Sequence, residues 1–209
     1  MNKVFVIGLP RTGTTSISIA LLDYGFKVAH TAYTKHAFEL ADVVTDAPCF
    51  ADYKELDKLF PDSKFVYLDR TLEHWVPSIQ MLLKKMLPEL APKSGYLNPV
   101  LKRCMNKVFA PLTAKDPLDK HYLENCYKTH QQSVFHYFAN RKDLLVINMG
   151  QKNGLQTLLE FVGIEDPTTG DFPHVNIGKQ VDSWKEFKHP NKINSLSAGK
   201  EHRQFFDYQ

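Results

Sequence analysis

A short loop near the start of the chain has the residue types and the spacing that bind a phosphate group. It reads GLPRTGTTS, residues 8–16, and its two glycines have the G-x-x-x-x-G spacing of a phosphate loop. An apolar run precedes the loop and a helical pattern follows it, as that motif requires. In such a turn several backbone N–H groups point at one position, and the helix dipole adds to the attraction for an anion. The pattern predicts an anion site; the alternative is a tight turn that binds no ligand.

The cation of this loop does not stand where an ATP-binding loop has it. The Walker loop places Lys directly after its second Gly, and here that position holds Thr14. The charge lies inside the loop instead, at Arg11, and Thr15 adds a second hydroxyl beside Thr14. A nucleotide kinase or NTPase with Mg²⁺-dependent ATP binding is therefore kept as an alternative, as is a P-loop protein that binds a nucleotide without catalysis. A dinucleotide loop is disfavoured because the middle Gly of G-x-G-x-x-G is missing.

The P-R-T-G-T-T-S arrangement resembles the 5'-phosphosulfate loop of the sulfotransferases, in particular the small bacterial-type members with an RTGTTS-like loop. The resemblance implies transfer of a sulfuryl group from 3'-phosphoadenosine 5'-phosphosulfate (PAPS) to a hydroxyl or amine, with release of adenosine 3',5'-bisphosphate (PAP). It also implies that Arg11 bridges the 5'-phosphate and the departing oxygen, while Thr14 and Thr15 bind the phosphate. The donor-binding residues expected in the loop are Pro10, Arg11, Thr12, Gly13, Thr14, Thr15 and Ser16.

Two further segments extend the resemblance along the chain. Sulfotransferases bind the 3'-phosphate of PAPS with an Arg at a strand end and a Ser eight residues later, and KFVYLDRTLEHWVPSI supplies Arg70 and Ser78. From the residues alone, Arg70 can hold a phosphate bidentately at the carboxyl end of its strand, and Ser78 can add a hydroxyl. Residues 138–178 resemble the closing strand, helix and FPxxN unit of the family. Together these segments cover nearly the whole chain.

The sequence also departs from the family pattern. Many cytosolic sulfotransferases have a Trp after the two threonines, which stacks on adenine, and here that residue is Ser16, so the adenine contact has no assigned residue. The C-terminal segment that binds the 3'-phosphate is not clear either. Lys200 with Arg203, or Gly178 with Lys179, are the candidates, and solvated surface side chains are the alternative for each.

Transfer to a hydroxyl requires a base close to the acceptor. His30, at the end of the second expected strand, is the first candidate, because many sulfotransferases place a His or Glu base in this region and because imidazole titrates near neutral pH. The alternative for His30 is a structural, hydrogen-bonded histidine. Asp46, at the end of DVVTD, is the second candidate and could instead orient the histidine or the acceptor; His36 and Asp52 also stay open.

No metal site is expected. The leaving group of the donor is a phosphate that is stable without added metal, so the reaction requires in-line alignment and stabilisation of charge on the departing oxygen. VYLD ends in Asp69 in the manner of a Walker B strand, but without the Walker lysine we interpret Asp69 as structural or as a partner of Arg70. The acceptor is expected to be a small molecule, a carbohydrate or a lipid; fold and donor site do not say which.

The elements that must position these residues alternate between strand and helix. Apolar runs predict strands at 3–8, 26–30, 42–46, 64–70 and 143–149, and helical periodicity predicts helices at 15–25, 51–61, 75–87, 118–140 and 154–163. This alternation predicts an α/β three-layer sandwich, a parallel sheet with helices on both faces, as in the P-loop NTPase-like sulfotransferase fold. We expect one domain, 1–209. Five prolines make the stretch 88–120 an insertion of loops and short helices that could recognise the acceptor.

Bulk composition narrows the function classes further. A net charge of +3 is mildly basic and argues against a nucleic-acid partner. Three widely spaced cysteines form neither a disulfide framework nor a zinc pattern, and no apolar stretch is long enough to span a membrane. We therefore expect a cytoplasmic enzyme with PAPS as cosubstrate; whether it forms a homodimer stays open.

Overall fold

The centre of this computed structural model is a five-stranded, all-parallel sheet with the order β2-β3-β1-β4-β5. The structure describes residues 3–91, 95–165, 172 and 183–198. The strands are β1 Val4–Val6, β2 Val28–Ala29, β3 Val43–Thr45, β4 Lys64–Asp69 and β5 Leu144–Asn148. The predicted parallel sheet is confirmed, and each strand is one to three residues shorter than its apolar run suggested.

The strands read as continuous apolar runs because both faces of the sheet are covered. Phe5 and Ile7 point into one apolar cluster and Val4 and Val6 into another, and all four are at most 3% exposed. The same alternation along β4 sends its neighbouring side chains into opposite layers. A strand with only one buried face would need polar residues at alternate positions.

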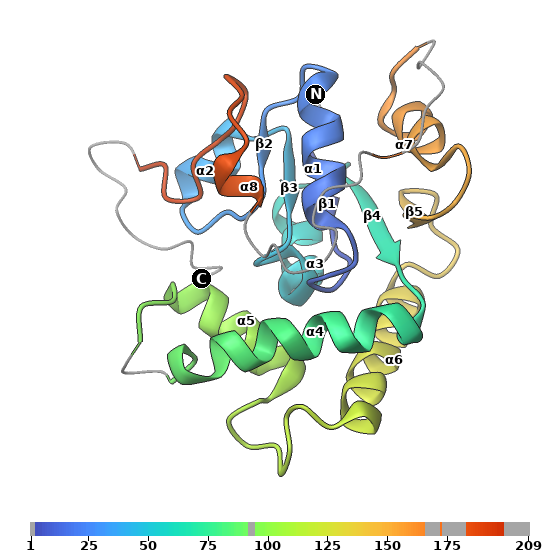
Figure 1. The fold of residues 1–209 in the computed structure, drawn as a ribbon. Helices are drawn as coiled ribbons and strands as arrows, with labels where there is room; N and C mark the ends of the chain where they lie inside the picture. Colours follow the sequence, from blue (N-terminus) through green and yellow to red (C-terminus); the bar gives the residue numbers. More distant parts are fainter. Residues whose placement is uncertain (1–2, 92–94, 166–171, 173–182, 199–209) are drawn as a thin grey trace.

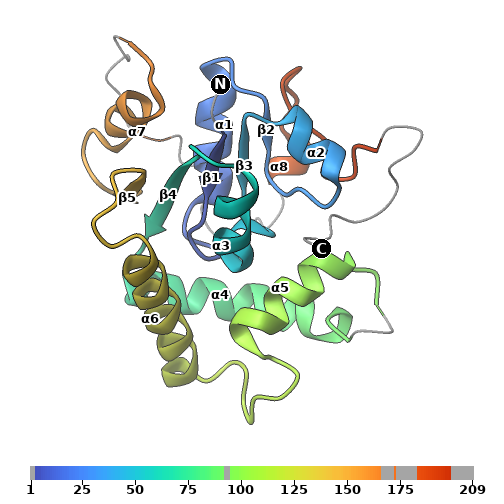
Figure 2. The ribbon, with the colours of Figure 1, turned by 180° about the vertical axis from the view of Figure 1, so that it is seen from behind.

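Helices form the two outer layers of the predicted sandwich (Figures 1 and 2). One face of the sheet packs against α1, α7 and α8, and the other against α2, α3 and α6. The bounds are α1 Thr14–Asp23, α2 Lys35–Leu40, α3 Cys49–Leu59, α6 Lys120–Tyr137, α7 Gly154–Val162 and α8 Ser183–Glu186. The α/β sandwich is therefore as predicted, except that α2 and α8 were not expected.

A third apolar core lies beyond the carboxyl ends of the strands. There α4 (Leu72–Met86), the 3₁₀ turn Leu87–Glu89 and α5 (Pro99–Phe109) pack together with the first half of α6. Trp75 and Phe109 are fully buried in this core. Figure 1 shows α4 crossing below the tip of β4, so these helices border the edge at which ligands of parallel sheets bind.

The insertion contains a longer helix than its prolines predicted. Residues 88–120 were expected to form loops and short helices, yet α5 runs for 11 residues. Pro99 stands at the first position of α5, where its missing N–H costs nothing and its fixed φ suits a helix. The side chain of Asn98 accepts a hydrogen bond from the N–H of Val100 and caps the helix. The proline therefore begins a helix instead of preventing one.

The C-terminal part of the described chain covers the edge of the sheet at β2. The N–H of Val28 donates to the carbonyl of Asn191 at 3.0 Å, and the N–H of Ile193 donates to the carbonyl of Val28 at 2.9 Å. The same segment brings the Ser195 hydroxyl to 2.5 Å from Thr31 Oγ1. It satisfies backbone groups that an open edge strand would leave unpaired.

Candidate functional site

The two glycines of the loop are required by close packing and by backbone conformation. A Cβ on Gly8 would lie 2.8 Å from the backbone of Leu68 in the neighbouring strand. Gly13 has a φ of +116°, and a Cβ there would lie 2.6 Å from Cγ of Met149. Their spacing thus allows the chain to turn sharply from β1 into α1. We call residues 11–16 of this turn the RTGTTS loop.

The structure brings together the three polar residues that the sequence assigned to the two phosphates. Arg11 Nε donates to Ser78 Oγ on α4 at 2.8 Å, and Arg70 Nη1 donates to the backbone carbonyl of Arg11 at 2.6 Å. Arg11 adopts a φ of 72°, a left-handed conformation that side chains other than Gly avoid. These contacts join the loop, the end of β4 and α4 into one polar cluster.

The two guanidinium groups of this cluster have no carboxylate partner within salt-bridge distance among the described residues. Both side chains are half-buried. Burial lowers the pKa of Arg11, and the charge of Arg70 lowers it further; burial likewise lowers the pKa of Arg70. Arginine stays protonated even so, so two positive charges lie close together. The charge of Asp46 acts on Arg11 in the opposite direction to burial, but no carboxylate of the described residues forms a salt bridge with either guanidinium. The arrangement favours an anion.

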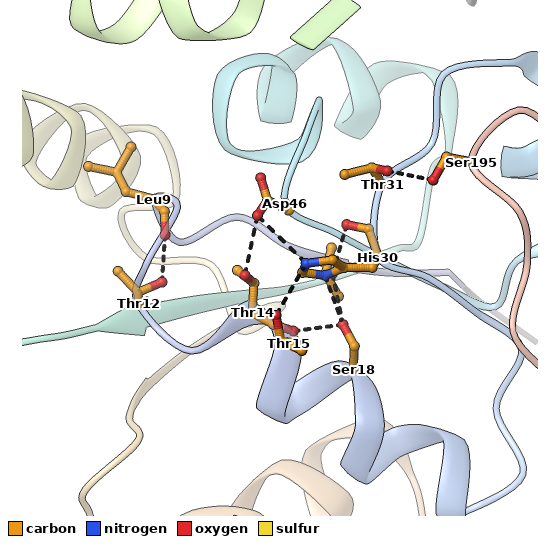
Figure 3. Close-up of polar contacts among 10 residues, drawn as sticks. Leu9, Thr12, Thr14, Thr15, Ser18, His30, Thr31, Asp46 and Ser195 are labelled. Carbon is orange, nitrogen blue, oxygen red and sulfur yellow. Dashed lines mark hydrogen bonds and ion pairs between the residues drawn. The ribbon is translucent and has the colours of Figure 1, made fainter. Parts of the chain in front are cut away.

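Further hydrogen bonds hold the backbone around these arginines. Trp75 Nε1 donates to the carbonyl of Pro10 at 2.9 Å, and Thr12 Oγ1 donates to the carbonyl of Leu9 at 2.7 Å (Figure 3). Asp69 Oδ1 accepts from Tyr127 Oη at 2.6 Å. Oδ1 also accepts from the backbone N–H of Arg70 and from Gln131. Asp69 therefore fixes the end of β4, as the structural interpretation of this residue predicted.

His30 lies beside the start of α1 (Figure 3). Its Nε2 is 3.3 Å from Thr15 Oγ1 and 3.9 Å from Asp46 Oδ2. Asp46 Oδ2 in turn accepts from Thr14 Oγ1 at 3.3 Å. Strand β3 lies between β2 and β1. The His30 imidazole, which follows β2, therefore reaches the loop across the end of β3. Both candidate bases therefore meet the paired threonines.

Two hydroxyls lie close to His30 Nδ1. Ser18 donates to the carbonyl of Thr14 at 2.7 Å, and Thr45 is placed to donate to the carbonyl of His30 at 3.1 Å or to Ser18 Oγ at 2.9 Å. When Thr45 donates to either of these oxygens, Nδ1 carries the proton and donates to Thr45 Oγ1 at 2.8 Å. In that tautomer of the neutral ring the lone pair is on Nε2, the atom 3.3 Å from Thr15 Oγ1.

Asp46 has the electrostatics of a carboxyl group that can exchange a proton near neutral pH. Burial raises its pKa to about 6, although hydrogen bonds from Thr14 and the N–H of Ala47 and the charge of Arg11 act in the opposite direction. The φ of Asp46 is 56°, so Asp46 is, after Arg11, a second residue with a left-handed backbone at the carboxyl edge of the sheet. Strained backbone of this kind gathers at functional sites.

The other two candidate bases are engaged elsewhere. Asp52 is 1% exposed and accepts two hydrogen bonds from Arg103, at 2.8 and 2.5 Å, and one from Lys107 at 3.1 Å. Burial pushes the pKa of Asp52 upward, but the hydrogen bonds and charges of both cations outweigh it and lower the pKa. His36 Nδ1 lies 3.3 Å from Glu39 Oε2 on α2. Among the described residues, no contact joins either side chain to the loop.

Sequence reasoning missed three residues that touch His30. Ser18 and Thr45 orient its ring, and the indole of Trp184 packs with ring centroids 5.3 Å apart. Thr45 directly precedes Asp46, and Ser18 lies one helical turn after Thr14. The sequence does not show that either residue contacts His30, because that contact depends on the packing of α1 against β3. Lys200, Arg203, Gly178 and Lys179, the C-terminal candidates, lie outside the described residues.

Searches for a metal site and a membrane span were negative. Within the described residues, no three side chains of His, Cys, Asp or Glu gather in a group that could hold a metal ion. No described helix combines the length and the hydropathy needed to cross a bilayer.

Comparison with known proteins identifies the family. Residues 3–181 match the family model described as a sulfotransferase domain, and the search of curated proteins finds no match. The matched range contains the sheet, the RTGTTS loop, the end of β4 and both candidate bases. The chain therefore belongs to the sulfotransferase domain family, and sulfotransfer is its general activity.

Proposed function

We propose that the protein transfers the sulfuryl group of PAPS to a hydroxyl or amine of a small molecule, carbohydrate or lipid. The observation that carries the proposal is the pair of half-buried guanidiniums, Arg11 and Arg70, which have no carboxylate partner in the described part of the chain. PAPS has two anionic ends, a 5'-phosphosulfate and a 3'-phosphate. One cation for each end, on a loop and on a strand end that touch, fits such a molecule.

The loop residues would bind the 5' end. The N–H groups at the start of α1, with the Thr14 and Thr15 hydroxyls, stabilise phosphate oxygens. Arg11 lies inside the turn and would neutralise charge on the oxygen that departs with the phosphate. Arg70 and Ser78 would bind the 3'-phosphate. The guanidinium of Arg70 can donate two hydrogen bonds to the phosphate oxygens. Ser78 already lies within hydrogen-bond distance of Arg11.

His30 would act as the general base. PAPS supplies the sulfuryl group; as the acceptor oxygen bonds to sulfur and the bond from sulfur to the phosphate oxygen breaks, the acceptor proton passes to His30 Nε2. As base, His30 would carry its proton on Nδ1 and donate it to Thr45 Oγ1, 2.8 Å away, with the lone pair of Nε2 toward the loop. Asp46 Oδ2, 3.9 Å from Nε2, would stabilise the imidazolium. The pKa of Asp46, about 6, also suits a carboxylate base, so the test below separates the two residues.

The position of the insertion supports a role in choosing the acceptor. Helices α4 and α5 pack together beyond the carboxyl ends of the strands, the edge that the RTGTTS loop occupies (Figure 1). An acceptor must approach the sulfuryl group from the side opposite the departing phosphate. This position supports the proposal that the third core forms part of the acceptor-binding wall.

Calorimetry with PAP tests the donor assignment. In EDTA, wild-type protein should bind PAP and should bind ATP more weakly, with or without Mg²⁺. Arg11→Ala and Arg70→Ala should each weaken PAP binding by roughly 10- to 100-fold, the value of a charged hydrogen bond of about 1.5–3 kcal/mol. Lys58→Ala, an exposed position of α3, is the matched control and should bind normally. If PAP does not bind and Mg²⁺-ATP does, the chain is an NTP-binding protein and the proposal is wrong.

Transfer of label from [35S]PAPS tests catalysis separately. His30→Ala should lose transfer while it keeps PAP affinity, since the proposed role of His30 is to take the acceptor proton. Asp46→Asn should keep part of the activity if Asp46 only stabilises the imidazolium, and none if it is the base. A wild-type chain that binds PAP tightly but labels no hydroxyl or amine acceptor would be a non-catalytic binding protein.

A further inference from the structure

A pocket separate from the RTGTTS loop lies between α3, α5 and α6, three helices on the face seen in Figure 2. Its volume is about 440 Å³, within the range of roughly 300–1,000 Å³ of pockets that hold drug-sized molecules. Among the described residues that line it, none is an expected donor-binding residue or a candidate base. The pocket is thus distinct from the expected donor site.

The wall of this pocket is mostly apolar. Phe50 and Ala51 of α3, Val108 of α5 and the ring of Tyr122 of α6 contribute to it. His130 also lines the pocket, and burial lowers its pKa to about 4, so its imidazole is neutral at physiological pH. His130 Nε2 is 2.7 Å from the carbonyl of Phe50 and must donate to it, because a carbonyl only accepts. The ring is therefore held as an uncharged part of the wall.

Of the two lysines on the rim of the pocket, one has no anionic partner among the residues that the structure describes. Lys107 is paired, with its Nζ 3.1 Å from Asp52 Oδ1 and 3.5 Å from Glu55 Oε1. Lys54 is exposed and forms no salt bridge with any described residue. Its Nζ lies 5.7 Å from the centroid of the Tyr53 ring, which also lines the pocket. The two lysines and one glutamate on the rim leave it positive.

We propose that this pocket binds a small amphipathic anion, an apolar or aromatic body that carries one carboxylate or sulfonate. The body would fill the wall of Phe50, Ala51, Val108 and Tyr122, and the anion would pair with Lys54. A cationic or a strongly polar molecule fits neither the charge of the rim nor the apolar wall. The proposal does not depend on the donor assignment, because it uses different residues.

Fluorescence of 8-anilinonaphthalene-1-sulfonate (ANS), an aromatic sulfonate, provides the first test. Wild-type protein should bind one ANS per chain with a saturable rise in emission. Lys54→Gln should weaken ANS binding about three- to fivefold, the value of an exposed ion pair. The matched control Lys58→Gln removes an exposed lysine of the same helix that does not line the pocket and should change nothing. The uncharged analogue N-phenyl-1-naphthylamine should bind wild type and Lys54→Gln equally.

Filling the pocket provides the second test. Ala51→Trp places an indole in the wall and should abolish ANS binding. Ala51 is only 6% exposed, so this variant can fail to fold; Thr129→Trp, from an exposed position of α6 that also lines the pocket, fills it without disturbing a core. Circular dichroism and thermal melting identify folded variants.

Alkylation of Cys126 locates the bound probe. Cys126 lines the pocket and is half-exposed, whereas Cys49 and Cys104 are fully buried. Saturating ANS should slow the reaction of Cys126 with iodoacetamide severalfold, measured by peptide mass spectrometry. If folded Thr129→Trp binds ANS as wild type does, or if ANS leaves the alkylation rate unchanged, the proposal is overturned. Loss of ANS binding in Arg11→Ala alone would assign the probe to the RTGTTS loop and overturn it as well.

Discussion

Two aspartates at the start of α3 lie six positions apart and have opposite electrostatics. Asp46 stands just before the helix. Its carboxylate lies near the Thr14 hydroxyl and the His30 imidazole, and burial raises its pKa to about 6. Asp52, inside the first turns, receives Arg103 bidentately and Lys107, and its pKa is lowered although burial acts in the other direction. Burial alone therefore does not separate a reactive carboxylate from a structural one. The charge of the partner does.

The cations of the two regions differ in the same way. Arg103 is committed to Asp52, so the α3–α5 cluster is electrically satisfied without a ligand. Arg11 and Arg70 point at a hydroxyl and a carbonyl, and no carboxylate within the described residues lies within salt-bridge distance of them. The loop region also contains the left-handed backbone of Arg11 and Asp46, which adds strain there. The ion pairs of one region are satisfied within the fold, whereas the arginines of the other have no salt-bridge partner among the described residues, as the proposed donor site requires.

The largest effect is expected from His30→Ala. If the loop region is the reactive one, transfer should fall by about 10²- to 10⁴-fold, the usual contribution of a general base, with the melting temperature little changed. Steady-state rates with [35S]PAPS measure it. A loss of activity that follows a loss of folded protein would instead assign His30 a structural role and remove the contrast between the two regions.

Arg103→Met tests the structural region. It leaves the carboxylate of Asp52, 1% exposed, with Lys107 alone, and the free energy of unfolding should fall by about 3 kcal/mol. Urea unfolding measures this. As a control, Lys58→Met on α3, the helix of Asp52, should lower the free energy of unfolding by less than about 0.5 kcal/mol. PAP affinity of the folded variant should stay at the wild-type value; a parallel loss of affinity would show that the two regions are one.

Asp46→Asn tests the raised pKa. The folded chain holds the Asp46 proton until about pH 6 and the unfolded chain until about pH 4, so ionisation costs stability as the pH rises between these values. Relative to wild type, Asp46→Asn should therefore gain stability across this window, by up to about 3 kcal/mol. Urea unfolding at a series of pH values measures it. Asp52, with its lowered pKa, gives the opposite slope, since its contribution is lost as the pH falls through its folded pKa.

The smallest effect is expected from Ser78→Ala. The variant removes a hydroxyl that accepts from Arg11 Nε at 2.8 Å and that would contact the 3'-phosphate. PAP affinity should fall roughly fivefold, the value of one neutral hydrogen bond of about 1 kcal/mol. Calorimetry measures it, with Ser133→Ala, whose hydroxyl pairs with Tyr53, as the matched control. Equal changes in both variants would contradict a specific role for Ser78.

The sequence determined the local part of this protein. The apolar runs around Val6 and Val66 specified a doubly covered parallel sheet because both faces of such strands must be buried. Gly8 and Gly13 specified the turn because a Cβ fits at neither position. The resemblance to the sulfotransferases singled out Arg11, Arg70 and Ser78 by their spacing, and the structure brings them into contact.

Only the tertiary structure decided which polar groups neutralise one another. From the sequence Asp52 stayed open as a candidate base, and only α5, which brings Arg103 across a separation of 51 positions, shows that its carboxylate is paired. The orientation of His30 likewise depends on Thr45 of a neighbouring strand. Hydrogen bonds and ion pairs act over a few ångströms, whereas their partners are far apart in the sequence, so the pattern names the candidate groups and the packing of the helices and strands pairs them.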